Sequence, residues 1–138
     1  MERLVHQPEL AKIANELIST TRDTFAISII GGDRISCCDE GVVCEIDGVA
    51  IGIATISKTG EMNSSEPTIV GVYVRKEYRR SGIGSGIFAR AICRCGERGF
   101  EKVRVDLLSK GGKRLVERLA PELRGKLDIH DFSSSMPF

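Results

Sequence analysis

The sequence predicts a mixed α/β (α+β) fold, because segments with strand character alternate with segments of helical period along the chain. Two strand-like segments meet at Asp47-Gly48, a pair typical of tight β-hairpins. A later segment, residues 82–97, carries apolar residues with the spacing of an amphipathic helix. The chain has 138 residues, the size of one ordinary domain, so a single domain over residues 1–138 is expected.

The N-terminal part begins with a helical pattern. Residues 8–18 repeat apolar side chains with helical period, and Pro8 suits a first helical turn. Residues 25–30 are apolar and too short to separate a strand from a helix, so both remain open. Gly31-Gly32 ends this segment in either case.

The central part predicts three strands. Residues 41–46 and 49–56 form a hairpin around Asp47-Gly48. The polar residues 58–66 form a loop, and residues 67–74, rich in β-branched side chains, form the next strand.

The C-terminal part continues with a helix over residues 82–97, which ends at Gly99. A strand over residues 102–108 follows. Gly111-Gly112 then leads into a short helix over residues 113–120, stopped by Pro121. A last strand over residues 127–132 and a loose tail over 133–138 complete the chain. The core face of the long helix is predicted to comprise Ile87, Phe88, Ala91, Ile92 and Cys95.

Composition excludes several classes of function. Twenty Lys and Arg against nineteen Asp and Glu give a net charge of +1, so a dedicated nucleic-acid binder is not expected. No apolar run reaches the ~18 residues of a membrane span, and the first residues lack the apolar core of a signal peptide. We therefore expect a cytoplasmic protein that does not bind membranes.

The five cysteines, an odd number, are expected to be buried and reduced rather than paired. Their spacing from one another and from the two histidines predicts no metal site.

The most informative segment is the turn within residues 72–86, where a strand runs through glycines into a helix. The first N–H groups of a helix have no intrahelical partner and lie at the positive end of its dipole. Glycine lets a phosphate approach them closely. Four cations, Arg75, Lys76, Arg79 and Arg80, crowd the same turn of a nearly neutral chain. Together these features predict a site for a pyrophosphate ligand.

Two nucleotide-binding patterns fit this turn poorly. A Walker loop requires a lysine that the turn lacks, and the dinucleotide fingerprint requires a glycine one position after Gly86. By contrast, Arg79-x-x-Gly82-x-Gly84, preceded by Val72-x-Val74 and followed by an amphipathic helix, resembles the acetyl-CoA signature of the GCN5-related N-acetyltransferase (GNAT) family.

This resemblance implies a central, mostly antiparallel sheet with a splayed parallel strand pair, flanked by helices. It implies acetyl-CoA as co-substrate and transfer of its acetyl group to a primary amine by direct attack. The strand before the turn would line the pantetheine arm, and the turn would hold the phosphates. The implied cofactor-binding residues are Val72, Tyr73, Val74, Arg79, Arg80, Ser81, Gly82, Ile83, Gly84, Ser85 and Ser109.

A second stretch, residues 109–119, resembles the family's next segment but departs from it. Ser109 stands where the family often has asparagine, and Val116 where it often has the tyrosine that protonates the leaving thiolate. If that alignment holds, the Val116 side chain faces the cofactor sulfur and cannot donate a proton.

Only residues 3–6 are available for the strand that opens the fold.

For the general base, the resemblance favours Glu66, which shares a strand face with the position most often used, Thr68 here. Glu45 and Asp47 are weaker alternatives. Two functions remain open: an acetyltransferase in which water replaces the acid, and a weak or inactive acyl-CoA-binding regulatory module. The acceptor amine is not identified, and an exposed final strand would allow two copies to pair.

Overall fold

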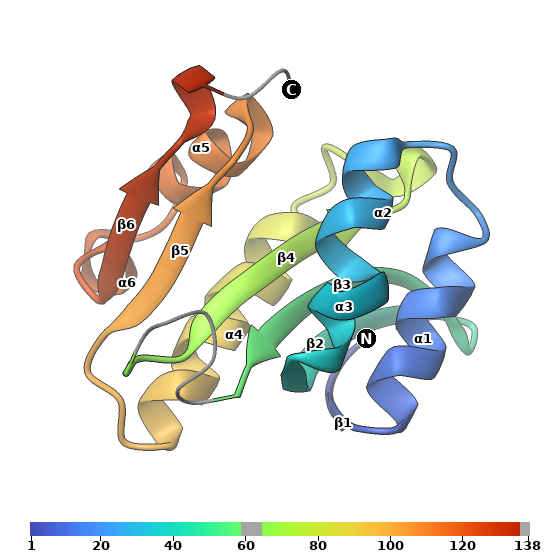
Figure 1. Ribbon diagram of the computed structural model, residues 1–138, viewed down its shortest axis with the longest axis horizontal. Coiled ribbons are helices and arrows are strands. Elements are labelled where there is room, and N and C mark those ends of the chain that lie inside the picture. Colours follow the sequence, from blue (N-terminus) through green and yellow to red (C-terminus); the bar gives the residue numbers. More distant parts are fainter. Residues whose placement is uncertain (59–64, 136–138) are drawn as a thin grey trace.

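The computed structural model describes residues 1–58 and 65–135. Within these residues one six-stranded sheet has its strands in chain order, with helices on both faces (Figure 1). Its strands are β1 (Glu2–His6), β2 (Cys38–Ile46), β3 (Val49–Ser57), β4 (Thr68–Val74), β5 (Val103–Leu107) and β6 (Leu127–Asp131). The helices are α1 (Glu9–Ile18), α2 (Thr24–Ile30), α3 (Gly32–Ser36), α4 (Ile83–Glu97), α5 (Lys110–Glu117) and α6 (Pro121–Arg124), with single 3-10 turns η2 (Lys76–Tyr78) and η3 (Ser133–Ser135).

The sheet is mixed, as the sequence predicts. The pairs β1–β2, β2–β3 and β3–β4 are antiparallel, whereas β4–β5 and β5–β6 are parallel. The hairpin between β2 and β3 turns through Asp47 and Gly48, whose φ angles of 51° and 78° are both left-handed. This confirms the tight turn, because the twist of two-residue hairpins favours such angles.

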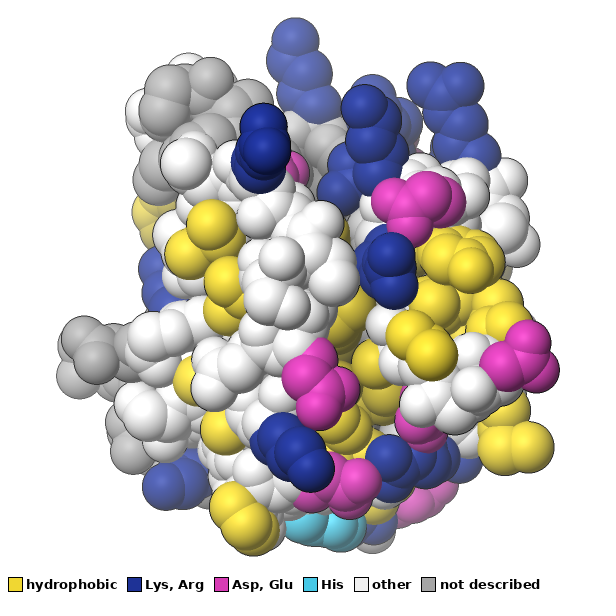
Figure 2. Space-filling view, turned by 90° about the vertical axis from the view of Figure 1, so that its right-hand side faces the viewer, with side chains coloured by type: hydrophobic (Ala, Val, Ile, Leu, Met, Phe, Trp, Pro, Cys, Tyr) yellow, Lys and Arg dark blue, Asp and Glu magenta, His cyan; other side chains and the backbone are white. Residues whose placement is uncertain are grey.

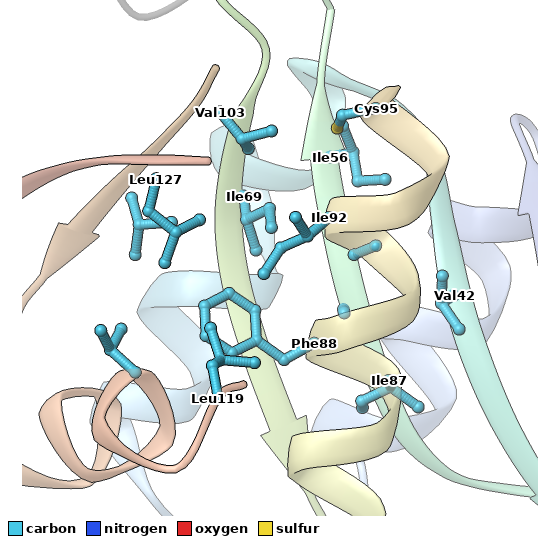
Figure 3. Packing of buried hydrophobic residues seen from close by; sticks show 14 of the residues in the cluster. Val42, Ile56, Ile69, Ile87, Phe88, Ile92, Cys95, Val103, Leu119 and Leu127 are labelled. Atoms are coloured by element: carbon cyan, nitrogen blue, oxygen red, sulfur yellow. The ribbon is translucent and has the colours of Figure 1, made fainter. Parts of the chain in front are cut away.

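One core lies between the sheet and α4. The stripe predicted from the sequence is confirmed, since Ile87, Phe88, Ala91, Ile92 and Cys95 are all buried on α4. Figure 3 shows Phe88 and Ile92 pointing from α4 toward β4, close to Leu119. This packing also draws in residues from α5 and β6 and fixes α4 along the sheet.

A second core lies on the opposite face, under α1 and α2. Residues 25–30, left open by the sequence, are helical. The carboxylate of Asp23 caps this helix by accepting from the backbone N–H of Phe25 and Ala26, at 3.0 and 3.4 Å. An aspartate cap of this kind satisfies helix-end donors, so the short apolar segment forms α2 rather than a strand.

Two expectations about the C-terminal part are wrong. The short helix α5 begins at Lys110 rather than at residue 113, because the Ser109 Oγ accepts from the Gly112 N–H at 3.1 Å and caps it. Both glycines therefore lie inside α5. Pro121 does not stop this helix; it begins α6, where a missing N–H costs little.

Some expectations fall outside the described residues. The loop predicted over residues 58–66 lies mostly in the gap at 59–64, and the tail predicted over 133–138 is described as far as residue 135. In the described part of the chain, no helix is long and apolar enough to cross a membrane.

The five cysteines are all unpaired, and four are buried or half-buried. Cys93 is exposed on α4, so the expectation that all are buried is wrong for this residue. Burial raises the pKa of the Cys38 thiol to about 12 and that of Cys95 to about 11. Cys93 is therefore the thiol most open to reagents in solution.

A β-bulge interrupts β4 where α2 lies against it. Thr55 of β3 pairs with Gly71 and Ile56 pairs with Ile69, so Val70 is an extra residue in β4. A Cβ on Gly71 would lie 2.8 Å from the Ile29 carbonyl oxygen, at the end of α2. The bulge and the missing side chain let α2 sit directly on the strand.

A buried carboxylate holds the C-terminal end of α4. The Glu40 side chain is 3% exposed and lies 3.1 Å from Arg94 Nε and 3.0 Å from Arg98 Nη1. His6 Nε2 on β1 lies 3.1 Å from the other carboxylate oxygen. A buried charge is tolerated when it is paired on every side, as it is here.

We expect Gly71→Ala to lower the free energy of unfolding by about 1–3 kcal/mol, the usual cost of overpacking. Gly96→Ala is the matched control, because a Cβ there has nothing within 4 Å. In α4, that change should be neutral or stabilising by up to about 1 kcal/mol. Thermal denaturation of both variants measures the difference, and equal Tm values would contradict the close seating of α2 on β4.

We also expect Glu40→Gln to lower the free energy of unfolding by about 3 kcal/mol, because two arginines lose their shared partner. Glu97→Gln is the control. Its side chain is 68% exposed, with its oxygen 3.5 Å from Arg94, and exposed pairs contribute under about 1 kcal/mol. Denaturant unfolding compares the two, and a Glu40→Gln loss no larger than the control would show that the cluster is not stabilising.

Candidate functional site

A cavity of about 750 Å³ lies where β4 and β5 diverge. These strands pair only at Thr68 with Arg104 and at Ile69 with Val105, within the described residues. Beyond those pairs they separate toward the β4–α4 turn (Figure 1). The cavity is lined by β4 from Ile69 onward, the C-terminal half of β5, the start of α4, one side of α2, and α5.

The bulge at Val70 explains the divergence. An extra residue bends a strand and strengthens its twist, and here it follows directly after the last residue that pairs with β5. Beyond Ile69, the described β4 pairs with β3 alone. Its backbone groups on the β5 side therefore face the cavity without a strand partner.

The turn into α4 has a strained backbone. Arg80 has a φ of 64°, in the left-handed region that non-glycine residues rarely adopt, and Gly82 has a φ of 86°. Gly82 is the N-cap of α4, and no side chain caps the helix. Left-handed residues in a turn direct the neighbouring backbone N–H groups toward one concave surface, which suits an anion. Strain held at such a place is a sign of function.

Arg79 closes the turn against β4. Its Nε donates to the Val74 carbonyl oxygen at 2.9 Å, and its guanidinium carbon lies 5.6 Å from the centre of the Tyr73 ring. The stacked position fixes the cation at the mouth of the cavity. The sequence predicted the charge at this position but not the contact with the ring.

The arginines that line the cavity come from the β4–α4 turn and from α5. Besides Arg79 and Arg80 they include Arg114 and Arg118, which stand one helical turn apart. Figure 2 shows lysine and arginine side chains along the upper edge of the molecule, the level at which the β4–α4 turn lies in Figure 1. Sequence reasoning missed Arg114 and Arg118; their spacing on a short basic helix was the available signal.

Most of the residues predicted from the sequence meet at this cavity. Nine of the eleven predicted cofactor-binding residues line it: Val72, Tyr73, Val74, Arg79, Arg80, Gly82, Gly84, Ser85 and Ser109. The other two do not. Ser81 donates its hydroxyl to the Tyr78 carbonyl, and Ile83 packs against the core.

Glu66, the predicted base, is not among the lining residues. It precedes β4 and lies against Asp128 of β6, with Lys102 and His130 nearby; desolvation and the contact with Asp128 raise its pKa. Ile69, the first lining residue of β4, is three positions further along the chain, which is about 10 Å of extended backbone. Its catalytic role stays a prediction.

Val116 does not face the cavity as expected. Its side chain is 5% exposed and belongs to the core between the sheet and α4, whereas the neighbouring Leu115 lines the cavity. Successive residues of a helix point about 100° apart, so with Leu115 at the cavity Val116 turns into the core. The described residues contain no group of three or more His, Cys, Asp or Glu side chains that could hold a metal ion.

Comparison with known protein families agrees with the resemblance seen in the sequence. Residues 16–119 match the family model described as the acetyltransferase (GNAT) family. No curated protein gave a significant match.

Several solved structures share the fold at low sequence identity. A ribosomal-protein-alanine N-acetyltransferase from Brucella melitensis is 19% identical with a TM-score of 0.57, covering 87% of this chain and 91% of its own. The aminoglycoside N-acetyltransferase AAC(6')-Iy, in complex with CoA, is 18% identical with a TM-score of 0.60, covering 87% and 90%. A GCN5-related N-acetyltransferase from Ralstonia eutropha is 17% identical with a TM-score of 0.60, covering 88% and 92%.

Proposed function

Because the chain belongs to the acetyltransferase (GNAT) family, whose members use acetyl-CoA, we propose that it transfers the acetyl group of acetyl-CoA to a primary amine by direct attack. The observation that carries this proposal is the cavity between β4 and β5, which ends at an uncapped helix N-terminus ringed by arginines.

The phosphate end of acetyl-CoA would lie at the start of α4. There the N–H groups of the first helical turn, the left-handed turn at Arg80 and Gly82, and the positive helix end all favour an anion. Arg79, Arg114 and Arg118 add charge from two sides of the cavity. Bidentate guanidinium contacts suit phosphate oxygens especially well.

The thioester end would lie in the divergence of the strands. The free β5-facing edge of β4 at residues 72–74 offers backbone groups to the pantetheine arm, in the manner of an added strand. A backbone N–H near Val72 would polarise the thioester carbonyl and stabilise the oxyanion that forms on attack.

The reaction needs little side-chain chemistry. The amine nitrogen attacks the thioester carbon, a C–N bond forms, and the C–S bond breaks. The thiolate of CoA is released, and the proton of the amine passes to water or to a carboxylate. Thiolate is a good leaving group, so a rate without a side-chain acid is chemically reasonable.

The regulatory-module alternative has one specific observation in its favour. Glu66, the expected base, does not line the cavity. Val116, which stands where the family often has the acid, does not line it either. A module of this kind would bind acetyl-CoA and acetylate no amine. A cytoplasmic location and pairing of two copies through β6 also stay predictions.

We expect CoA and acetyl-CoA to raise the Tm, since a ligand at ~100 times its Kd adds about 2.7 kcal/mol. Gly84→Glu should abolish this shift, because its carboxylate would occupy and repel the phosphate position. A Cβ at Gly84 has no contact under 3.4 Å, so the variant should fold.

Gly96→Glu, the same change at an open site of the same helix, should keep the CoA shift. Thermal shift assays with CoA, ATP and NAD test all three proteins. Equal shifts from the three ligands, or an unchanged CoA shift in Gly84→Glu, would contradict the phosphate site.

Glu66→Gln tests the predicted role of Glu66 as the base: because a base must come within hydrogen-bond reach of the amine, a kcat that stays within about tenfold of the unchanged protein would contradict that role. The product should be followed by mass spectrometry, since the exposed Cys93 would react in a thiol-colour assay. A loss of a hundredfold or more with an unchanged Tm would instead identify Glu66 as the base.

A further inference from the structure

The charged side chains that line the cavity are separated by sign. The four arginines come from the β4–α4 turn and from α5, and the carboxylates that line it within the described residues are Asp106 of β5 and Asp23 at the start of α2. We propose that the acceptor is an aliphatic amine carrying a second positive charge, such as a diamine. Asp106 would hold the reactive end, whose ammonium form gives one proton to water or to that carboxylate before the neutral amine attacks, and Asp23 would hold the distant ammonium. This inference rests on the proposed acetyl transfer.

Asp106 lies on the face of the sheet that is turned away from α4. On β5, Val103, Val105 and Leu107 point into the core beneath α4. The alternation of a strand therefore turns Asp106 to the other face, as it does Leu108, which packs with the core under α1 and α2. Asp106 follows directly after Val105, the last residue paired to β4. Its carboxylate thus stands where the strands begin to part.

The surroundings of Asp106 hold it in place. Arg104 Nε lies 2.9 Å from its Oδ1, and the Asp106 side chain is 19% exposed. A half-buried carboxylate interacts more strongly with a cation than one in open water does. The side chain is fixed by one contact and stands beside the expected position of the thioester.

Asp23 marks the outer end of the same face. It caps α2, and its exposed position lies at the rim of the cavity. Between the rim and the interior, the lining residues of α2 are Phe25, Ala26 and Ile29. A chain of methylene groups suits this apolar wall, with a charge at either end. The arginines across the cavity would repel such a dication from the phosphate end.

The first experiment compares two acceptors of equal chain length. Acetylation of 1,4-diaminobutane and of butylamine is followed by mass spectrometry at saturating acetyl-CoA. We expect kcat/KM to be at least about tenfold higher for the diamine, since one charged contact is worth that factor or more. Equal kcat/KM values for the two amines would overturn the inference. A higher kcat/KM for a peptide whose N-terminal amine is its one positive charge would overturn it too.

Three substitutions assign the effect to residues. Asp23→Asn removes the charge while asparagine still caps α2. It should lower kcat/KM for the diamine about tenfold and leave butylamine unchanged. Asp106→Asn should lower kcat/KM for both amines about tenfold or more. Asp131→Asn on β6 is the control: it does not line the cavity, its asparagine can still accept from the Ser133 N–H, and it should change neither.

Failure of the inference is separable from failure of the proposed function. All three variants should keep the thermal shift with CoA, because none stands on the phosphate side. A protein that binds CoA and acetylates butylamine as well as the diamine refutes the charge-based acceptor site. One that acetylates other amines but no diamine also refutes it. Absence of any CoA shift, or CoA binding without acetylation of any amine, refutes the proposed function itself.

Discussion

The structure depends on one interruption of backbone pairing. An extra residue at Val70 of β4 lets the strand keep its ladder with β3 while losing its ladder with β5 after two pairs. Sheet edges exposed in the middle of a fold are normally avoided, because unpaired backbone groups are costly. Here the unpaired backbone groups of β4 line a cavity of about 750 Å³. Arginines of the β4–α4 turn and α5 line one part of it, and Asp106 and Asp23 line another.

The bulge also decides which residues face which side. Before it, Ile69 packs with the core beneath α4; after it, Val72 and Val74 pack there, and Tyr73 packs beneath α2. A simple alternation from Ile69 would have reversed the last three. Gly71 allows the end of α2 to approach the displaced backbone, so the acceptor-side wall is seated on the same irregularity that opens the cavity.

These irregularities mark the limit of what the sequence could predict. The hairpin at Asp47-Gly48 and the buried stripe of α4 follow from local rules of twist and period, and both were predicted. The glycine-bearing turn into α4 was predicted for the same reason, and its residues Arg79, Arg80 and Gly82 line the cavity. The fold of residues 25–30 depended on the cap by Asp23, which period alone does not reveal.

Residues far from the turn were predicted less well. The expected direction of Val116 assumed the family's spacing across the second stretch, but Leu115 rather than Val116 lines the cavity. The arginines of α5 and the aspartates of α2 and β5 come together only through tertiary packing. A local sequence pattern does not tell how far apart such segments lie in the folded chain.

The Glu40 cluster has a geometric consequence for the opposite end of α4. The helix has fifteen residues, so its ends are about 22 Å apart. If the C-terminal end were free to tilt the helix by about 5° around its middle contacts, each end would swing by roughly 1 Å, more than the tolerance of a well-ordered binding site. The contacts of Arg94 and Arg98 with the buried Glu40 carboxylate thus fix the C-terminal end of α4. In doing so they also fix the direction in which the first turn of the helix points at its other end.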